Sequence, residues 1–237
     1  MRIMTYNIQS GRDAFKTLDL DKCLSVINEF NPDILSLNEV RMKTADIGNC
    51  RQADELAEKL GMQVFFAKAI DYMGGEYGVA LLSKYPITEA CAIPVPQLPP
   101  EKRDSRYEDR VLLKARLLID SQALTVYVSH YGLSEAEREN AVNLTLSELE
   151  KEKDPAIFMG DLNMKPDHPL IGRLKGVLTD TAAGASFFTF HALSPTQKID
   201  YIFVKGGFRT ENTFAPLTTA SDHLPVIADV CLLHGLC

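Results

Sequence analysis

Six short apolar segments of the sequence end or begin at a polar side chain that can bind a metal ion or carry a proton. These side chains are Asn7, Glu39, His130, Asp161 with Asn163, Asp200, and Asp222 with His223. Polar groups at the ends of apolar strands line the rim of a sheet, so we expect the six segments to converge on one site. Asp200 is the strongest single indication, because it lies among apolar residues, where an unpaired acid is costly.

The donor atoms of this set indicate its chemistry. Asparagine, aspartate and glutamate supply hard oxygen ligands, which suit Mg²⁺, with Mn²⁺ as a substitute. Two histidines without clustered cysteines fit acid–base or phosphate-stabilising roles better than a zinc cage. A divalent ion, a carboxylate that orients water, and imidazoles beside a developing oxyanion together predict a metal-assisted phosphoester hydrolase.

Each of these residues also has an interpretation that involves no chemistry. Asn7 alone would be a turn residue, and Asp161 would form an Asx turn with the residues after it. Glu39 would be a solvated strand end, and His223 a structural histidine. What favours a site is the joint occurrence of these residues at successive strand ends.

Hydrophobic periodicity indicates which elements position these groups. Helical spacing predicts helices at residues 20–30, 52–60 and 134–151, the last with a capping box of Ser134 and Glu137. Runs rich in β-branched and aromatic residues predict strands at 2–7, 33–40, 64–67, 78–83, 90–95, 111–119, 123–129, 156–159, 199–204 and 225–230. The proline-rich stretch 94–109 is expected to form a long surface loop.

Strands dominate this pattern, and helices are inserted between them. The order fits neither a strict alternation of strands and helices nor a pure sandwich. Two packed mixed sheets with helices outside would cover every apolar face. A chain of 237 residues can bury a substantial core, and since no repeat or linker divides it, we expect a single domain over residues 1–237.

Composition limits the classes of partner and compartment. The net charge is −7, from 32 acidic residues against 25 lysines and arginines, which disfavours a tight grip on a long nucleic acid. The sequence lacks CxxC spacing, a secretory signal and an apolar run of about 20 residues. We therefore expect a cytoplasmic protein with no transmembrane segment and with reduced thiols, which are Cys23, Cys50, Cys91, Cys231 and Cys237.

The motifs that carry these residues follow one another along almost the whole chain. They read Thr5-Tyr6-Asn7, Asn38-Glu39-Val40, Gly160-Asp161-Leu162-Asn163, Lys198-Ile199-Asp200-Tyr201 and Ser221-Asp222-His223-Leu224-Pro225. In this order they resemble the endonuclease/exonuclease/phosphatase superfamily of deoxyribonuclease I-like phosphohydrolases. The resemblance implies an α/β fold, a four-layered α/β sandwich in which two mixed β-sheets pack face to face with helices outside.

The resemblance also implies how a metal ion and the phosphate are bound. Glu39 looks like the principal ligand of Mg²⁺, and Asn7 would lie next to the metal or the scissile phosphate. Asp222 would assist metal binding. Arg110, at the start of a predicted strand, occupies a place where the family often has an arginine that contacts the substrate phosphate, although a free surface arginine is an alternative.

Catalytic roles are implied for the remaining residues. Asp161 looks like the acid that orients or deprotonates water, and Asn163 would bind the phosphate and help to hold Asp161. His223 would contact a non-bridging phosphate oxygen and Asp200 would fix its tautomer and charge. His130 would be a second imidazole near the phosphate or the leaving group.

The substrate class is less constrained by the sequence. Gln9 stands where abasic-site endonucleases carry an acid, there is no tryptophan, and no long basic run occurs. These features favour a small phosphoester, either a monoester or a diester. A nuclease or end-processing phosphodiesterase on DNA or RNA is the alternative, and a catalytically dead binding module is a third reading. The retention of Glu39, Asp161 and His223 argues against that third reading.

Overall fold

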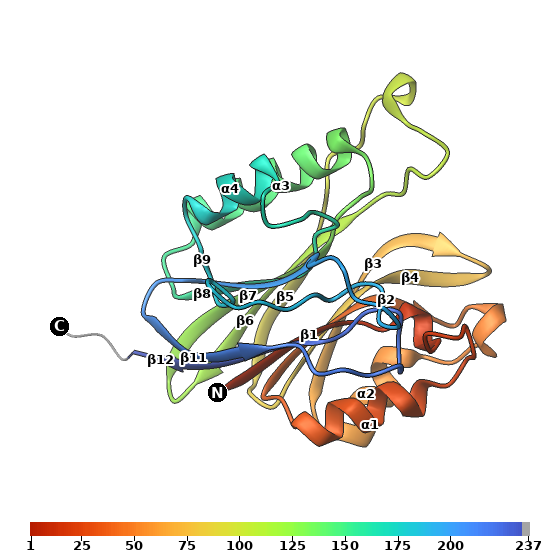
Figure 1. The fold of residues 1–237 in the computed structure, drawn as a ribbon, viewed down its shortest axis with the longest axis horizontal. Coiled ribbons are helices and arrows are strands. Elements are labelled where there is room, and N and C mark those ends of the chain that lie inside the picture. Colours follow the sequence, from red (N-terminus) through yellow and green to blue (C-terminus); the bar gives the residue numbers. More distant parts are fainter. Residues whose placement is uncertain (234–237) are drawn as a thin grey trace.

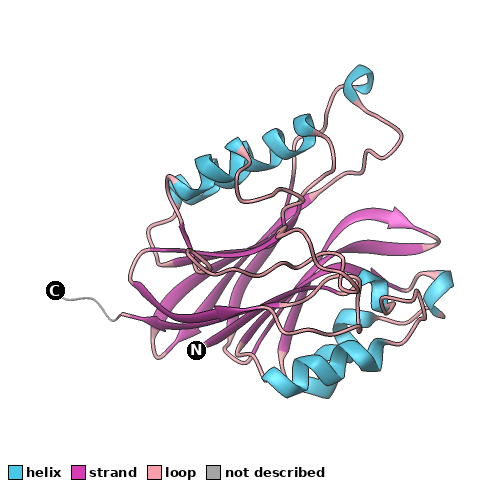
Figure 2. Ribbon diagram, viewed as in Figure 1, coloured by secondary structure: helices cyan, strands magenta, loops and turns pink. Residues whose placement is uncertain are grey.

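The computed structural model describes residues 1–233, and it contains two six-stranded sheets packed face to face (Figures 1 and 2). The strands are β1 (Arg2–Asn7), β2 (Ile34–Met42), β3 (Gln63–Tyr72), β4 (Gly75–Ser83), β5 (Ile87–Pro94), β6 (Val111–Ile119), β7 (Gln122–His130), β8 (Ala156–Asp161), β9 (Thr179–Asp180), β10 (Asp200–Lys205), β11 (Phe208–Phe214) and β12 (Val226–Leu232). The first sheet has the order β11-β12-β1-β2-β4-β3 and the second β5-β6-β7-β8-β10-β9. Cys237 lies outside the described residues.

Helices cover the outer face of each sheet. The helices are α1 (Leu20–Phe30), α2 (Gln52–Leu60), α3 (Glu135–Lys151) and α4 (Pro169–Lys175). In Figure 1, α1 and α2 lie on the first sheet, and α3 and α4 lie on the second. The layers are therefore helix, sheet, sheet and helix, which confirms the predicted four-layered α/β sandwich.

Alternating side chains along the strands produce three apolar layers. Ile3 of β1 packs between the sheets with residues of β6 and β7, such as Leu113 and Val126. Its neighbour Met4 faces the other way, into the cluster that includes Ile27 of α1. A third layer joins the second sheet to α3 and α4. Burial on both faces explains why these strands read as nearly continuous apolar runs.

The predicted helices are present with their predicted ends. The hydroxyl of Ser134 accepts a hydrogen bond from the Glu137 backbone N–H, and the Glu137 carboxylate accepts from the Ser134 N–H, so the capping box forms. Gly61 ends α2 with a φ of 64°, the left-handed conformation that glycine adopts at little cost. No helix within residues 1–233 combines the length and apolarity needed to cross a bilayer.

Three elements were not predicted, and two predictions on strands were wrong. Sequence periodicity missed α4, β9 and β11, which are short or largely exposed. The strand predicted at 64–67 extends to Tyr72, because pairing with β4 continues past a bulge. The strand predicted to stop at Val40 runs to Met42, so Glu39 lies inside β2 and not at its end.

Candidate active site

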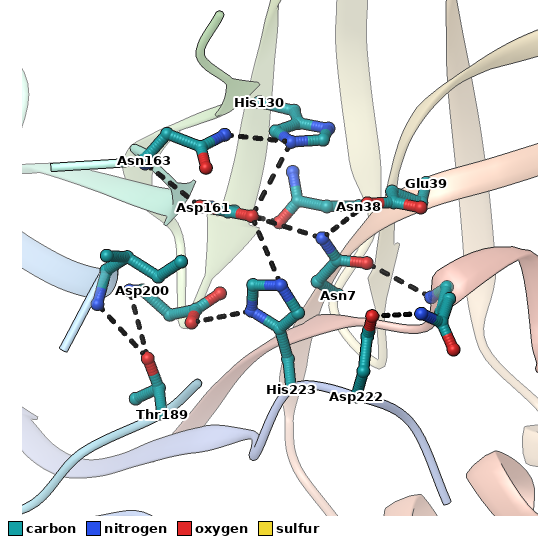
Figure 3. Close-up of polar contacts among 12 residues, drawn as sticks. Asn7, Asn38, Glu39, His130, Asp161, Asn163, Thr189, Asp200, Asp222 and His223 are labelled. Atoms are coloured by element: carbon teal, nitrogen blue, oxygen red, sulfur yellow. Dashed lines mark hydrogen bonds and ion pairs between the residues drawn. The ribbon is translucent and has the colours of Figure 1, made fainter. Parts of the chain in front are cut away.

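The predicted polar residues meet at one edge of the two sheets (Figure 3). Asn7, His130 and Asp161 are the last residues of β1, β7 and β8. β10 runs antiparallel to β8, with Asp200 opposite Asp161, so its first residue reaches the same edge. The chain enters β12 antiparallel to β1, which brings the segment before β12 there too. The site therefore combines the ends of parallel strands with the beginnings of antiparallel ones.

Asp161 lies at the centre of this group. Its Oδ2 accepts a hydrogen bond from Asn7 Nδ2 at 3.1 Å, and its Oδ1 accepts from the Asn163 N–H at 2.9 Å. The imidazole Nε2 atoms of His130 and His223 lie 3.5 and 3.6 Å from Oδ2. Burial, followed by the negative charge of Asp200, raises the pKa of Asp161 above its ordinary value. A carboxylate of raised pKa is a stronger proton acceptor.

Two neighbours fix the backbone that carries Asp161. Gly160 has a φ of +145°, and a Cβ there would lie 1.9 Å from the Ser129 carbonyl oxygen, so only glycine fits. The buried Asn38 of β2 reaches across to the second sheet. Its Nδ2 donates to Ser129 O at 3.0 Å, and its Oδ1 accepts from the Asp161 N–H at 3.2 Å. Asn38 belongs to the sequence motif Asn38-Glu39-Val40, but the sequence did not predict this role for it.

His223 and Asp200 form a buried pair. His223 Nδ1 lies 2.9 Å from Asp200 Oδ2, and both residues are almost fully buried. Burial alone would lower the pKa of His223, but the Asp200 and Asp161 carboxylates outweigh it and raise that pKa to about 10. His223 is therefore an imidazolium at neutral pH, and Asp200 is placed to hold its orientation.

His130 has the opposite electrostatic environment. Arg110 Nη1 lies 3.3 Å from His130 Nδ1. A guanidinium can only donate, so we assign Nδ1 as the acceptor and the ring proton to Nε2, which lies 3.5 Å from Asp161 Oδ2. Asn163 Nδ2 lies 3.3 Å from the same Nε2, but its shorter contact is the hydrogen bond that it donates to the Tyr131 carbonyl. Burial, then the charges of Arg110 and His223, hold the pKa of His130 well below its ordinary range. The ring is therefore neutral.

Glu39 projects into the site from a bulge in β2. The register with β4 shifts between Leu37 and Val40, and Glu39 takes a φ of 59°, which re-aims its side chain. Asn7 Nδ2 donates to Glu39 Oε1 at 3.0 Å. Burial raises the pKa of the Glu39 carboxyl, and the bond from Asn7 opposes that rise.

Asp222 and Asn163 form hydrogen bonds with other residues of the protein in addition to their predicted roles at the metal and the phosphate. Asp222 Oδ2 accepts hydrogen bonds from Gln9 Nε2 and from Lys16 Nζ, the latter at 3.2 Å. Gln9, the departure from the abasic-site pattern, thus binds the carboxylate that a second acid would repel. Asn163 Nδ2 donates to the Tyr131 carbonyl at 2.9 Å, while its backbone holds Asp161.

These residues open into a pocket of about 610 Å³. Glu39, Asp161, Asp222 and both histidines line it, as does Arg110, which is paired with Glu108 at 3.0 Å. Further lining residues were missed by sequence reasoning, namely Arg41, Tyr72, Tyr77, Arg106, Glu108, Leu133, Phe190 and Ile199. Arg41 alone had a usable signal, because it follows Glu39 by two residues on one strand and so faces the same side.

Part of the predicted surface loop reaches this pocket. Residues Arg106 and Glu108 of the 94–109 stretch line it, while Val95 and Leu98 are buried in the protein. Of the apolar side chains of the loop, Val95 and Leu98 are therefore part of the core, whereas the prolines at 94, 96, 99 and 100 are exposed.

Two groups of residues could hold a divalent cation. Ligand atoms of Asp161, Asp200 and His223 lie within 4.8 Å of one another, but both ring nitrogens of His223 face carboxylates and its ring is cationic. A cation fits better at Glu39, where burial penalises the unneutralised charge and the carboxylates of Asp161 and Asp222 line the same pocket. Asn7 turns its amide nitrogen toward Glu39 and Asp161 and its oxygen toward the Gln9 N–H, so it would bind a cation only after its amide turns over. This donor set fits Mg²⁺ or Mn²⁺.

Comparison with known proteins finds a family model and curated relatives that match nearly the whole chain. The chain matches the model of the Endonuclease/Exonuclease/phosphatase family over residues 4–223. Uncharacterized protein YbhP of Escherichia coli K12 is 26% identical over 255 aligned residues, covering 98% of this chain and 96% of YbhP.

Solved structures share the fold. An endonuclease/exonuclease/phosphatase from Beutenbergia cavernae superposes with a TM-score of 0.82 at 21% identity, covering 98% of this chain and 72% of that one. The mannosyl-6-phosphatase Bt3783 of Bacteroides thetaiotaomicron gives 0.75 at 19% identity, covering 98% and 99%. With a family match over most of its length, this chain belongs to the endonuclease/exonuclease/phosphatase family, whose members are hydrolases that act on phosphoesters.

Proposed function

We propose that this protein is a Mg²⁺-dependent phosphoester hydrolase that acts on a small substrate. The observation that carries the proposal is the position of Asp161, a buried carboxylate of raised pKa that borders the pocket between a cationic and a neutral imidazole. Such a carboxylate can accept a proton from water while the cation beside it stabilises phosphate charge.

The reaction then follows from the groups present. Asp161 accepts a proton from a water molecule as the water oxygen attacks phosphorus. The bond between phosphorus and the leaving oxygen breaks, and the leaving oxygen takes up a proton from solvent. His223 donates a hydrogen bond to a non-bridging phosphate oxygen from Nε2, whose distance of 3.6 Å from Asp161 is longer than a hydrogen bond. Arg110 adds positive charge on the opposite side. Asn163 and Asn7 hold Asp161 in place through the bonds described above.

Glu39 is the proposed principal metal ligand, with Asn7 and Asp222 as the other ligands on this chain. A bound Mg²⁺ would polarise the phosphate and neutralise charge that develops on it. Asp222 already accepts hydrogen bonds from Gln9 and Lys16, so it is a weaker candidate for a metal ligand than Glu39.

A small substrate is supported by the size and charge of the site. A pocket of about 610 Å³ is within the range of small-molecule sites. The net charge of −7 disfavours a long polyanion. Bt3783, which shares the fold, is a mannosyl-6-phosphatase, so phosphorylated sugars are the first monoesters to test.

The experiment is a substrate panel with purified protein, with EDTA followed by re-addition of Mg²⁺ or Mn²⁺. The panel holds bis-p-nitrophenyl phosphate, p-nitrophenyl phosphate, sugar phosphates, nucleotides, single-stranded and duplex DNA, and RNA. We expect metal-dependent hydrolysis of a small ester, lost in Glu39→Gln and kept in Glu89→Gln, an exposed control on β5. Faster turnover of DNA or RNA would favour the nuclease alternative. Full activity in EDTA would overturn the metal mechanism.

A further inference from the structure

The buried charge pair Asp200–His223 joins two different sheets. Asp200 begins β10 in the second sheet, and His223 precedes β12 in the first. Their bond of 2.9 Å therefore depends on how the two sheets are held together at this edge. The segment between β9 and β10 crosses that gap, and Thr189 lies in it, fully buried.

Thr189 contacts both partners' segments at once. Its Oγ1 accepts hydrogen bonds from the N–H groups of Ile199 and Asp200, at 3.1 and 3.4 Å. Its carbonyl oxygen accepts from the Leu224 N–H at 2.7 Å, directly after His223. Figure 3 shows the hydroxyl of Thr189 below Asp200, with dashed lines to the backbone nitrogens, while the imidazole of His223 lies on the other side of the Asp200 carboxylate. Thr189 thus links the backbone of Asp200 to the backbone next to His223.

The carboxylate of Asp200 has little else to fix it. Within residues 1–233, its Oδ1 is buried and has no hydrogen-bond partner, so only Oδ2 is held, and by His223 itself. The position of the Asp200 backbone then decides where the carboxylate lies. The next residue along the bridging segment, Phe190, packs its ring 4.8 Å from that of His223, which limits the imidazole from the other side.

We propose that Thr189 is a positioning residue that aligns Asp200 with His223 across the two sheets. The catalytic consequence rests on the proposed function, whereas the alignment itself is a property of the folded chain. A displacement of about 1 Å in a catalytic group can cost about a hundredfold in rate. Loss of one of several contacts should displace Asp200 less than that, and we expect a loss of about tenfold.

The test compares Thr189→Val, which keeps the shape but loses the hydroxyl, with Thr189→Ser, which restores it. Thr181→Val is the matched control, because the buried Thr181 also bonds β10, through Ile202 O at 2.9 Å, but lies away from His223. We expect Thr189→Val to lower kcat about tenfold with KM changed less than twofold. Thr189→Ser should recover most of the rate, and Thr181→Val should stay within twofold of wild type.

A second readout needs neither metal nor substrate. The His223 Nδ1–H bonded to Asp200 should give a downfield proton resonance, identified by its absence in His223→Gln. We expect Thr189→Val to shift or broaden this resonance and Thr181→Val to preserve it. If Thr189→Val does not fold, Thr189→Cys supplies a weaker acceptor of similar size and should give a smaller change of the same kind.

An unchanged resonance and rate in Thr189→Val would overturn the proposal, as would an equal loss of rate in Thr181→Val at equal loss of thermal stability. If wild-type protein hydrolyses no phosphoester, the proposed function fails, while the resonance still decides the role of Thr189.

Discussion

Asp161 lies between two imidazole rings that differ in charge. On one side, His223 is paired with Asp200 and is cationic. On the other, His130 accepts from Arg110 and is neutral. Both Nε2 atoms face the same Asp161 oxygen at nearly equal distance. The charge of each histidine is therefore set by burial together with the charged residues around it, and not by its distance from Asp161.

This contrast suggests a division of labour. The cationic ring can stabilise charge that develops on a phosphate. The neutral ring lies 3.5 Å from Asp161 and brings no charge, so the positive charge on that side belongs to Arg110. Substitutions on the two sides of Asp161 should therefore lower kcat by unequal amounts.

The largest effect is expected at the residue that both sides share. Asp161→Asn should lower kcat by at least about a hundredfold, because an amide cannot accept the proton of water. Steady-state kinetics on the best small ester measures this. Asp167→Asn, an exposed neighbour, is the control and should leave kcat unchanged. Wild-type turnover in Asp161→Asn would show that water is activated elsewhere.

The cationic side should come next. His223→Gln should lower kcat by about a hundredfold or more, the usual scale for losing a charged donor at an oxyanion. Asp200→Asn should cost less, about tenfold, because the ring stays but loses the carboxylate that supports its charge. Kinetics of the two variants at one pH test this order. A larger loss in Asp200→Asn than in His223→Gln would contradict it.

The neutral side should be more tolerant. His130→Gln keeps a side-chain N–H donor near Asp161 and should lower kcat by about tenfold or less. The comparison with His223→Gln, made under the same conditions, is the measurement. Equal losses in the two variants would show that His130 also carries charge and would remove the contrast.

The smallest effect is on stability, and its sign differs between the two rings. A folded pKa of about 10 for His223 gives a stabilisation that is full below about pH 6.5 and lost as pH rises toward 10. The lowered pKa of His130 gives a stabilisation present above about pH 6.5 and lost as pH falls.

Urea unfolding between pH 5 and 9 tests this opposition. The stability difference between wild type and His223→Gln should shrink toward the alkaline end. The difference between wild type and His130→Gln should shrink toward the acid end. Two curves of the same slope would mean that the rings share one charge state.

Much of the fold could be predicted because local signals agree with it. The helices α1, α2 and α3 begin and end at residues with clear periodicity or capping, and β6 has its predicted bounds. The elements that were missed lack such signals. β11 has no fully buried residue and α4 spans only seven residues, so neither shows a sustained apolar period.

The sequence predicted which residues gather at this edge better than it predicted the hydrogen bonds among them. Asn7, Glu39, Asp161 and the others were found because polar side chains at the ends of apolar strands stand out. Thr189 and Asn38 were not, since a threonine or an asparagine beside an apolar run has many ordinary uses. Their importance depends on which backbone groups the other sheet brings to them.

The sequence alone therefore determined the fold class and the residue types available for chemistry, because burial patterns and donor atoms are written in residue order. Only the tertiary structure decided the charge and the orientation of these side chains. The charge of each histidine depends on its burial and on the charged residues packed against it, and the orientation of the Glu39 side chain depends on a bulge in β2. These properties come from contacts between residues far apart in the chain, at distances that no spacing along the sequence specifies.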